Sequence, residues 1–207
     1  MLPLPQKFTH SKRPKAMTVS SGTYASTRTT NSLLWKQMKL GNEKAFAALF
    51  KKWYNDLYYY GLKIVQDETL VKDAIQDVFL EVWSSRTKLS DATHPKIYLT
   101  TSLRRRLIRL INKNKKEYSQ KREAMEHYHN FELTVEDFII TSEQNDHKIN
   151  NMRKGIQQLT KTQKEVVFLK YYNGFDDREI SEILNIKYQS VRNTVHRALV
   201  NLRKVLG

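Results

Sequence analysis

The sequence predicts an all-α protein with two small helical domains joined by a flexible acidic linker. Three observations predict this fold class. Apolar residues recur at spacings of three and four in two long segments, which is the period of an amphipathic helix. Glycine and proline number only 6 and 4 in 207 residues, which disfavours turn-rich β folds. Between the two segments the apolar residues lose this period and acidic residues become frequent.

Charge and periodicity divide the chain into four parts. Residues 1–31 carry five basic residues and no acid among Ser, Thr and Pro, which predicts a disordered basic tail. Residues 32–116 form the first predicted helical domain, and residues 151–207 form the second. Residues 117–150 are the predicted linker, in which seven acids and no Lys or Arg lie between Glu123 and His147. Its apolar residues are scattered rather than periodic.

Three apolar stripes predict three helices in the first domain. In chain order, the stripes occupy residues 45–60, 71–83 and 97–111. Breaks in the pattern fall near Gly41, at residues 66–68 and across residues 90–95. The last break ends in Pro95, and proline suits the first turn of the helix that follows.

The second domain carries local signals for helix ends. Thr160 and Gln163 have the spacing of a capping box, and Gly174 suits the end of the helix that they begin. Asp176 is a candidate N-cap for the next helix, and Asn185 tolerates the left-handed turn that would end it. A long helix from Tyr188 to about Val205 follows, so the pattern is helix, short turn, helix.

Composition limits the classes of function. Lys and Arg outnumber Asp and Glu by 36 to 21, and this net charge of +15 favours a polyanionic partner. The chain has no cysteine, which excludes disulfides, a thiolate nucleophile and a Cys-bearing zinc site. No apolar run is long enough for a membrane helix or a secretory signal. We therefore expect a cytoplasmic protein without direct membrane insertion.

Catalytic motifs are missing from the sequence. It contains no glycine-rich phosphate loop ending in Lys-Ser or Lys-Thr and no His-Glu-x-x-His motif. Its six histidines show no ligand spacing. We expect no catalytic residue, no metal and no cofactor, so the protein is not predicted to be an enzyme.

The last predicted helix separates into two faces, which predicts that it binds DNA. Its inner stripe comprises Val191, Val195, Ala198, Leu199, Leu202 and Leu206. Its outward polar residues are Tyr188, Gln189, Ser190, Arg192, Asn193, His196 and Arg197. A major groove admits one α-helix, where Arg pairs with guanine and Gln or Asn with adenine. The alternative interpretation is a solvated polar face on an ordinary helical hairpin.

A second basic region lies on the third predicted helix of the first domain. Its candidate residues are Tyr98, Thr101, Ser102, Arg104, Arg105, Arg106 and Arg109. Aromatic and hydroxyl groups beside a cationic helix suit a separated nucleic-acid strand, because bases stack while Arg and Lys contact phosphates. The alternative is a solvated charged face, but so many like charges repel one another without a polyanion.

An acidic stripe lies on the second predicted helix. Its residues, at helical spacings, are Asp73, Gln76, Asp77 and Glu81. An acidic surface repels DNA, so on this basic chain it suggests a protein partner with a basic surface. The alternative is that these residues only keep the helix soluble.

The order of these parts resembles the bacterial sigma-70 family, in its extracytoplasmic-function (ECF) group. The run DAIQDVFLEVW at 73–83 resembles the family's second region, and KIYLTTSLR at 96–104 resembles its promoter-melting segment. Residues 159–202, which include EISEIL at 179–184, resemble its fourth region. The large middle domain of housekeeping sigma factors has no counterpart here, as in the ECF group.

This resemblance implies a dissociable subunit of RNA polymerase that directs transcription initiation. The acidic stripe would dock on the clamp helices of the largest core subunit. The basic helix would capture the melted −10 strand, and the last helix would enter the −35 major groove. An anti-sigma protein is a further implied partner. Arg105 and Arg109 stand where relatives commonly have Asn and Asp, which suggests generic strand binding and recruitment by another DNA-targeting protein.

Other classes of nucleic-acid-binding protein fit some of the same features. A stand-alone helix-turn-helix regulator would bind duplex DNA without polymerase and would not need the acidic stripe. An RNA-binding module built on the basic helix would prefer structured RNA to single-stranded promoter DNA.

Overall fold

The computed structural model describes residues 31–90, 94–117, 131–138 and 146–206. In these residues the regular structure is helical and no strand occurs, which confirms the all-α prediction. The first helix includes residues 31–39. It is followed by α2 (Glu43–Ile64), α3 (Glu68–Ser84), η1 (Arg86–Lys88), α4 (Pro95–Glu117), η4 (Val135–Asp137), α5 (Asp146–Gln157), α6 (Lys161–Val167), η5 (Phe168–Tyr172), α7 (Asp177–Leu184) and α8 (Tyr188–Leu206).

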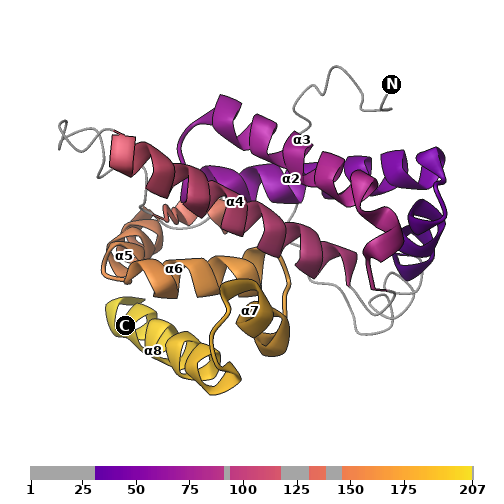
Figure 1. The fold of residues 1–207 in the computed structure, drawn as a ribbon. Coiled ribbons are helices and arrows are strands. Elements are labelled where there is room, and N and C mark those ends of the chain that lie inside the picture. The colour runs from indigo at the N-terminus through magenta and orange to yellow at the C-terminus, as the bar shows by residue number, and fades with distance from the viewer. Residues whose placement is uncertain (1–30, 91–93, 118–130, 139–145, 207) are drawn as a thin grey trace. The chain divides into compact units, whose positions relative to one another are not determined.

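The chain folds into two compact units (Figure 1). The first is built from the first helix, from α2 up to Leu62 and from α3 and α4. The second is built from the end of α2, from η4 and from α5 to α8. The predicted tail at 1–31 lies outside the described residues except for Asn31, and so do residues 118–130 and 139–145 of the predicted linker.

The core of the first unit forms where the three predicted apolar stripes meet. Phe46 and Phe50 of α2 each pack edge-on against Phe79 of α3, with ring centroids 5.9 and 4.8 Å apart. Leu103 and Leu107 of α4 are fully buried with them. The third stripe begins at the predicted first-turn proline, because α4 starts at Pro95.

The first helix adds aromatic surface to this core. Trp35 and Met38 are 1% and 0% exposed, and the Trp35 ring lies 5.7 Å from that of Tyr98 in α4. The three stripes did not include these residues, because only two turns of this helix are apolar on one side. The first helix therefore supports the part of α4 that contains the candidate strand-binding residues.

The helix ends of the second unit are those that the sequence predicts. Thr160 and Gln163 form the capping box, each side chain bonded to the other's backbone N–H. Asp176 caps α7 and forms a second capping box with Glu179. Asn185 has φ of 54° and ψ of 49°, the left-handed conformation that ends α7. These turns fix the direction in which α8 leaves α7.

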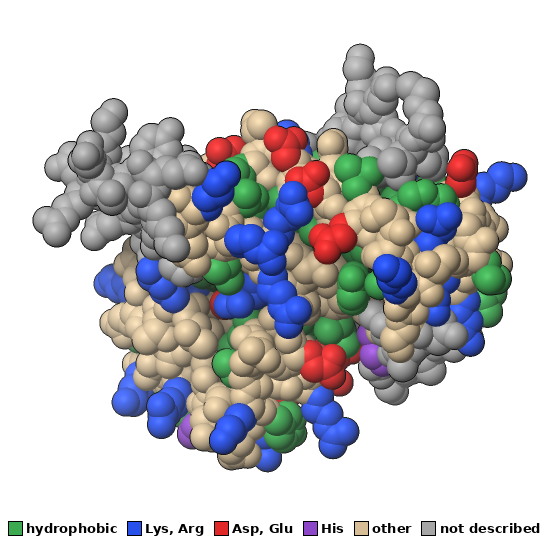
Figure 2. Space-filling view, in the orientation of Figure 1, with side chains coloured by type: hydrophobic (Ala, Val, Ile, Leu, Met, Phe, Trp, Pro, Cys, Tyr) green, Lys and Arg blue, Asp and Glu red, His purple; other side chains and the backbone are tan. Residues whose placement is uncertain are grey.

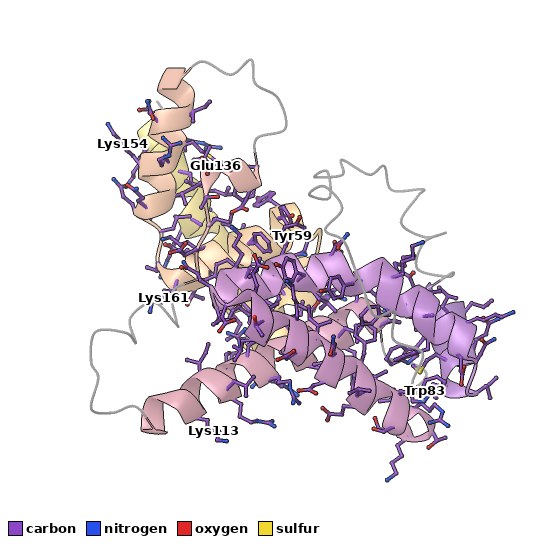
Figure 3. The ribbon with its side chains drawn as sticks, turned by 90° about the horizontal axis from the view of Figure 1, so that it is seen from above. Tyr59, Trp83, Lys113, Glu136, Lys154 and Lys161 are labelled. Atoms are coloured by element: carbon purple, nitrogen blue, oxygen red, sulfur yellow. The ribbon has the colours of Figure 1, made fainter. Side chains whose placement is uncertain are left out.

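Part of the predicted linker packs within the second unit. Phe131, Leu133 and Val135 are buried, which is expected of alternate residues in an extended segment with one side against a core. The Phe131 ring lies 5.6 Å from that of Phe168, and Glu136 accepts a hydrogen bond from Arg153 of α5 at 3.3 Å. Figure 3 shows Glu136 beside α5, where Lys154 is also labelled. The apolar residues that look scattered in the sequence thus pack together into the core of the second unit.

Candidate nucleic-acid interface and acidic ledge

The outward face of α8 is accessible along its N-terminal half. Every residue of the predicted recognition face is exposed, including Tyr188, of which 43% of the surface is accessible. Val191 and Ala198 on the opposite face are fully buried. Gln189 Nε2 donates a hydrogen bond to Asn193 Oδ1 at 3.3 Å, so two amides one turn apart are aligned on the exposed face. This arrangement leaves Arg and amide groups free to reach base edges.

The turn before α8 is held by backbone hydrogen bonds. Ile186 N donates to Ser181 O at 3.1 Å, and Ser190 N donates to Lys187 O at 2.9 Å. Lys170 Nζ also lies 2.5 Å from Asp177 Oδ1, which connects η5 to the start of α7. Because these contacts fix both ends of α7, the exposed face of α8 is carried on a rigid support.

Leu199 is a correction to the predicted inner stripe of α8. Its side chain is 40% exposed, whereas Val191, Val195, Ala198 and Leu202 are buried. At about 100° per residue, position 199 lies some 60° or more from the centre of the stripe. The sequence pattern placed it inside because it is apolar, but its angular position puts it at the edge.

The basic residues of α4 point in different directions. Arg105 and Arg109, one turn apart, are exposed, and Tyr98, Thr101 and Ser102 are partly exposed on neighbouring turns. Arg104 is half-buried. Lys113 extends from the C-terminal part of the helix (Figure 3). At about 100° per residue, Tyr98, Thr101, Ser102, Arg105 and Arg109 therefore share one face of α4, whereas Arg104 and Arg106 lie to either side of it.

Arg106 points toward α3, where its guanidinium forms an ion pair with Asp77. The excess positive charge on α4 is thus partly neutralised inside the unit, which the sequence argument from repulsion did not anticipate. Asp77 is itself a predicted docking residue. The sequence placed these two residues in separate sites, 29 positions apart, and the fold brings them into contact.

We call Asp73, Gln76, Asp77 and Glu81 of α3 the acidic ledge. Asp73, Gln76 and Glu81 are exposed, and Asp77 is half-exposed. The opposite side of α3 supplies Val71, Ile75, Val78 and Phe79 to the core. Figure 2 shows acidic side chains over α3 next to basic side chains over α4. Surfaces of opposite charge therefore adjoin on this unit.

Two further clusters were missed by sequence reasoning. Lys52 and Lys96 both lie over the Trp53 ring, 5.4 and 5.5 Å from its centroid, and Lys96 is 3.4 Å from Asp56. Burial lowers the pKa of Lys52. These contacts fix the start of α4 on α2. No motif encodes the contacts of Lys96 with Trp53 and Asp56, because residues so far apart in the sequence meet only in the folded unit.

Tyr58 of α2 forms the second cluster. Burial raises its pKa above the usual value, and a hydrogen bond with Glu68 adds to the shift. Lys72 lies 2.9 Å from Glu68 and over the Tyr58 ring, 5.6 Å from its centroid. This cluster holds the start of α3 against α2.

The described residues offer neither a metal-binding cluster nor a membrane-spanning helix. Within them, no group of three or more His, Asp or Glu side chains is placed to hold a metal ion. None of the helices described here has the length and apolar character needed to cross a membrane.

Family models match both units. The model for sigma-70 region 2 matches residues 49–117, and the model for sigma-70 region 4 matches residues 149–202. Together these ranges take in more than half of the chain, in the order that the family has them. The chain belongs to the sigma-70 family. Its exposed α8 face lies within the region 4 match, and the acidic ledge and α4 lie within the region 2 match.

Curated relatives place this sigma factor in the ECF group. The ECF sigma factor SigK of Mycobacterium ulcerans is 25% identical over 178 residues, which cover 85% of this chain and 92% of SigK. The ECF sigma factor SigX of Bacillus subtilis is 23% identical over 165 residues, which cover 78% of this chain and 84% of SigX.

Solved structures share the fold of this sigma factor. CnrH, in complex with the cytosolic domain of CnrY, has 18% identity and a TM-score of 0.55 over 85% of this chain and 96% of CnrH. The sigma factor RpoE of Bartonella quintana, in complex with the anti-sigma factor NepR, has 17% identity and a TM-score of 0.56. That match covers 79% of this chain and 97% of RpoE.

Proposed function

We propose that this ECF sigma factor docks on core RNA polymerase through the acidic ledge and contacts promoter DNA with two helices. The face of α8 that carries Arg192 and Asn193 enters the −35 major groove. The face of α4 that carries Arg105 and Arg109 holds the melted −10 strand. The observation that carries the proposal is the exposure of an acidic and a basic surface on neighbouring helices of one unit, with a polar recognition face on the other.

Binding alone accounts for strand opening in this proposal. A surface that binds unpaired nucleotides more tightly than duplex DNA shifts the equilibrium toward the melted state. The size of the shift is set by the difference between the two affinities, and no side-chain chemistry is needed. The arginines of α4 supply the phosphate contacts, and Tyr98 supplies an aromatic ring beside them. The protein works where the polymerase works, in the cytoplasm, without cofactor or metal.

An anti-sigma protein is a further proposed partner. CnrH and RpoE, which share the fold, were solved in complexes with CnrY and with the anti-sigma factor NepR. The extra cations at Arg105 and Arg109 also support recruitment of this factor to promoters by a separate DNA-targeting protein. Co-purification with a tagged chain from its host is the direct measurement for both.

Run-off transcription with purified core polymerase tests the main proposal. We expect defined start sites when the chain is added and loss of them with Glu81→Lys, which reverses a charge on the exposed ledge. Glu43→Lys is the matched control, because Glu43 is an exposed acid on α2 of the same unit. Equal activity of both variants contradicts docking through the ledge. A stand-alone regulator would instead bind duplex DNA and give no polymerase-dependent start sites.

A further inference from the structure

The ion pair between Asp77 and Arg106 joins two surfaces to which different partners are assigned. Asp77 belongs to the acidic ledge of α3, and Arg106 belongs to the basic helix α4. Their side chains are 45% and 32% exposed, so each remains within reach of a large partner. A cation from a docked protein and a phosphate from DNA can therefore compete with this pair.

The hydrogen bonding of the pair is incomplete. Arg106 Nη2 donates to Asp77 Oδ2, but Arg106 Nε is buried and has no hydrogen-bond partner in the described residues. A buried N–H group without a partner is unfavourable, since it has lost its water and gained nothing in return. Arg106 thus does not satisfy all of its hydrogen-bond donors while it is paired with Asp77. A second conformation of the Arg106 side chain can therefore be close in free energy to the paired one.

We propose that the Asp77–Arg106 pair is a gate that couples polymerase docking to strand capture. This inference rests on the proposed function. In the free chain, Asp77 neutralises Arg106 and keeps it from DNA. When a basic group of the polymerase pairs with Asp77, Arg106 is released and binds a phosphate of the single strand. Arg106 therefore contacts the strand directly, and Asp77 is a positioning residue that acts through Arg106.

Linkage makes the coupling reciprocal. If docking on Asp77 strengthens strand binding, then the strand strengthens docking by the same factor. Arg105 and Arg109 are exposed in the chain alone, so they give it a basal affinity for the strand that does not depend on the gate. Asp73 lies one helical turn before Asp77 and is exposed, so it offers a charge-matched comparison.

Binding of a single-stranded DNA oligonucleotide to the full chain is the first test. Asp77→Asn keeps the side-chain shape but releases Arg106, and we expect binding about two- to five-fold tighter than with Asp73→Asn. Asp73→Asn is the control, because it removes one negative charge from the same helix without breaking the pair with Arg106. The double variant Asp77→Asn with Arg106→Gln should lose this extra affinity. Equal affinities of Asp77→Asn and Asp73→Asn overturn the gate while leaving strand capture intact.

Binding of core polymerase with and without the oligonucleotide is the second test. We expect the oligonucleotide to tighten polymerase binding for the wild type and for Glu43→Gln, which removes an exposed acid outside the ledge, but not for Asp77→Asn. A purely structural role of the pair would change stability, measured by thermal unfolding, and would leave this coupling factor unchanged; that result overturns the gate. If the wild-type chain binds neither oligonucleotide nor polymerase, the proposed function itself fails.

Discussion

Gly61 of α2 and Val71 of α3 lie so close that a side chain on Gly61 would overlap Val71. A β-carbon at Gly61 would be 2.6 Å from Val71 Cγ1 and 3.5 Å from Leu107 Cδ1 of α4. The three core helices of the first unit therefore approach one another closely at this glycine. The contact lies at the C-terminal part of α2, so it fixes how α3 and α4, with their charged surfaces, are set on the unit.

Gly61→Ala should destabilise the first unit by about 1–3 kcal/mol, because the added methyl group overpacks a closed contact. Urea unfolding of the full chain, followed by tryptophan fluorescence, measures the change, since all three tryptophans lie in this unit. Val71→Ala makes room for the methyl group. In the Val71→Ala background, Gly61→Ala should lower the free energy of unfolding by much less. An equal loss in both backgrounds would show that the contact between Gly61 and Val71 does not limit the space.

Asp176→Ala should destabilise α7 by about 0.5–2 kcal/mol, because the Asp176 carboxylate accepts hydrogen bonds from Arg178 N and Glu179 N at 2.8 and 2.9 Å. Amide hydrogen exchange in α7 and α8 measures the loss. Glu182→Ala is the control, since it removes an exposed carboxylate from the same helix without removing a cap. Equal exchange rates in the two variants would count against the capping box as a determinant of stability.

Phe131→Ala should weaken the second unit by about 3 kcal/mol, because it removes a buried ring that packs against Phe168. Phe138→Ala removes the same atoms from a half-exposed position and should cost much less. Hydrogen exchange of α6 amides in the full chain compares the two. If both variants behave like the wild type, the segment at 131–138 contributes nothing to the second unit.

Raising the pH above about 10 should destabilise the first unit through Tyr58. Its pKa is raised in the folded state by burial, so above the ordinary value of 10.0 the unfolded chain loses this proton first. The contribution of Tyr58 to the free energy of unfolding is complete below that pH and is lost as the pH rises above it. Tyr58→Phe should flatten the decline in unfolding free energy on the alkaline side. An unchanged slope in this variant would show that Tyr58 does not cause the decline at alkaline pH.

Local rules account for the parts of the structure that were predicted from sequence. A capping box, a turn asparagine or a first-turn proline acts within a few residues, so Thr160, Asp176, Asn185 and Pro95 could be interpreted without the fold. The apolar stripes of α2, α3 and α4 needed only helical spacing. In each case the physical cause lies within one turn or one helix of the residue concerned.

The parts that sequence reasoning missed depend on contacts between distant segments. Asp77 and Arg106 were assigned to separate surfaces, because no local rule shows which arginine of a basic run turns toward an acid on another helix. The packing of Phe131 on Phe168 was missed for the same reason. Leu199 differs from its predicted buried position because apolar character alone does not show where a residue lies around α8.

Arg192→Ala should weaken binding of duplex promoter DNA by about 1–3 kcal/mol if the exposed face of α8 reads base edges. Lys154→Ala is the matched control, because it removes one exposed positive charge from α5 of the same unit. A cation that contacts only phosphate affects all sequences alike, whereas a base contact changes the preference among sequences. Fluorescence anisotropy with duplexes that vary at single −35 positions separates the two effects. Arg192→Ala should relax the preference at one or two positions, and an equal loss of affinity for every duplex would assign Arg192 to the backbone instead.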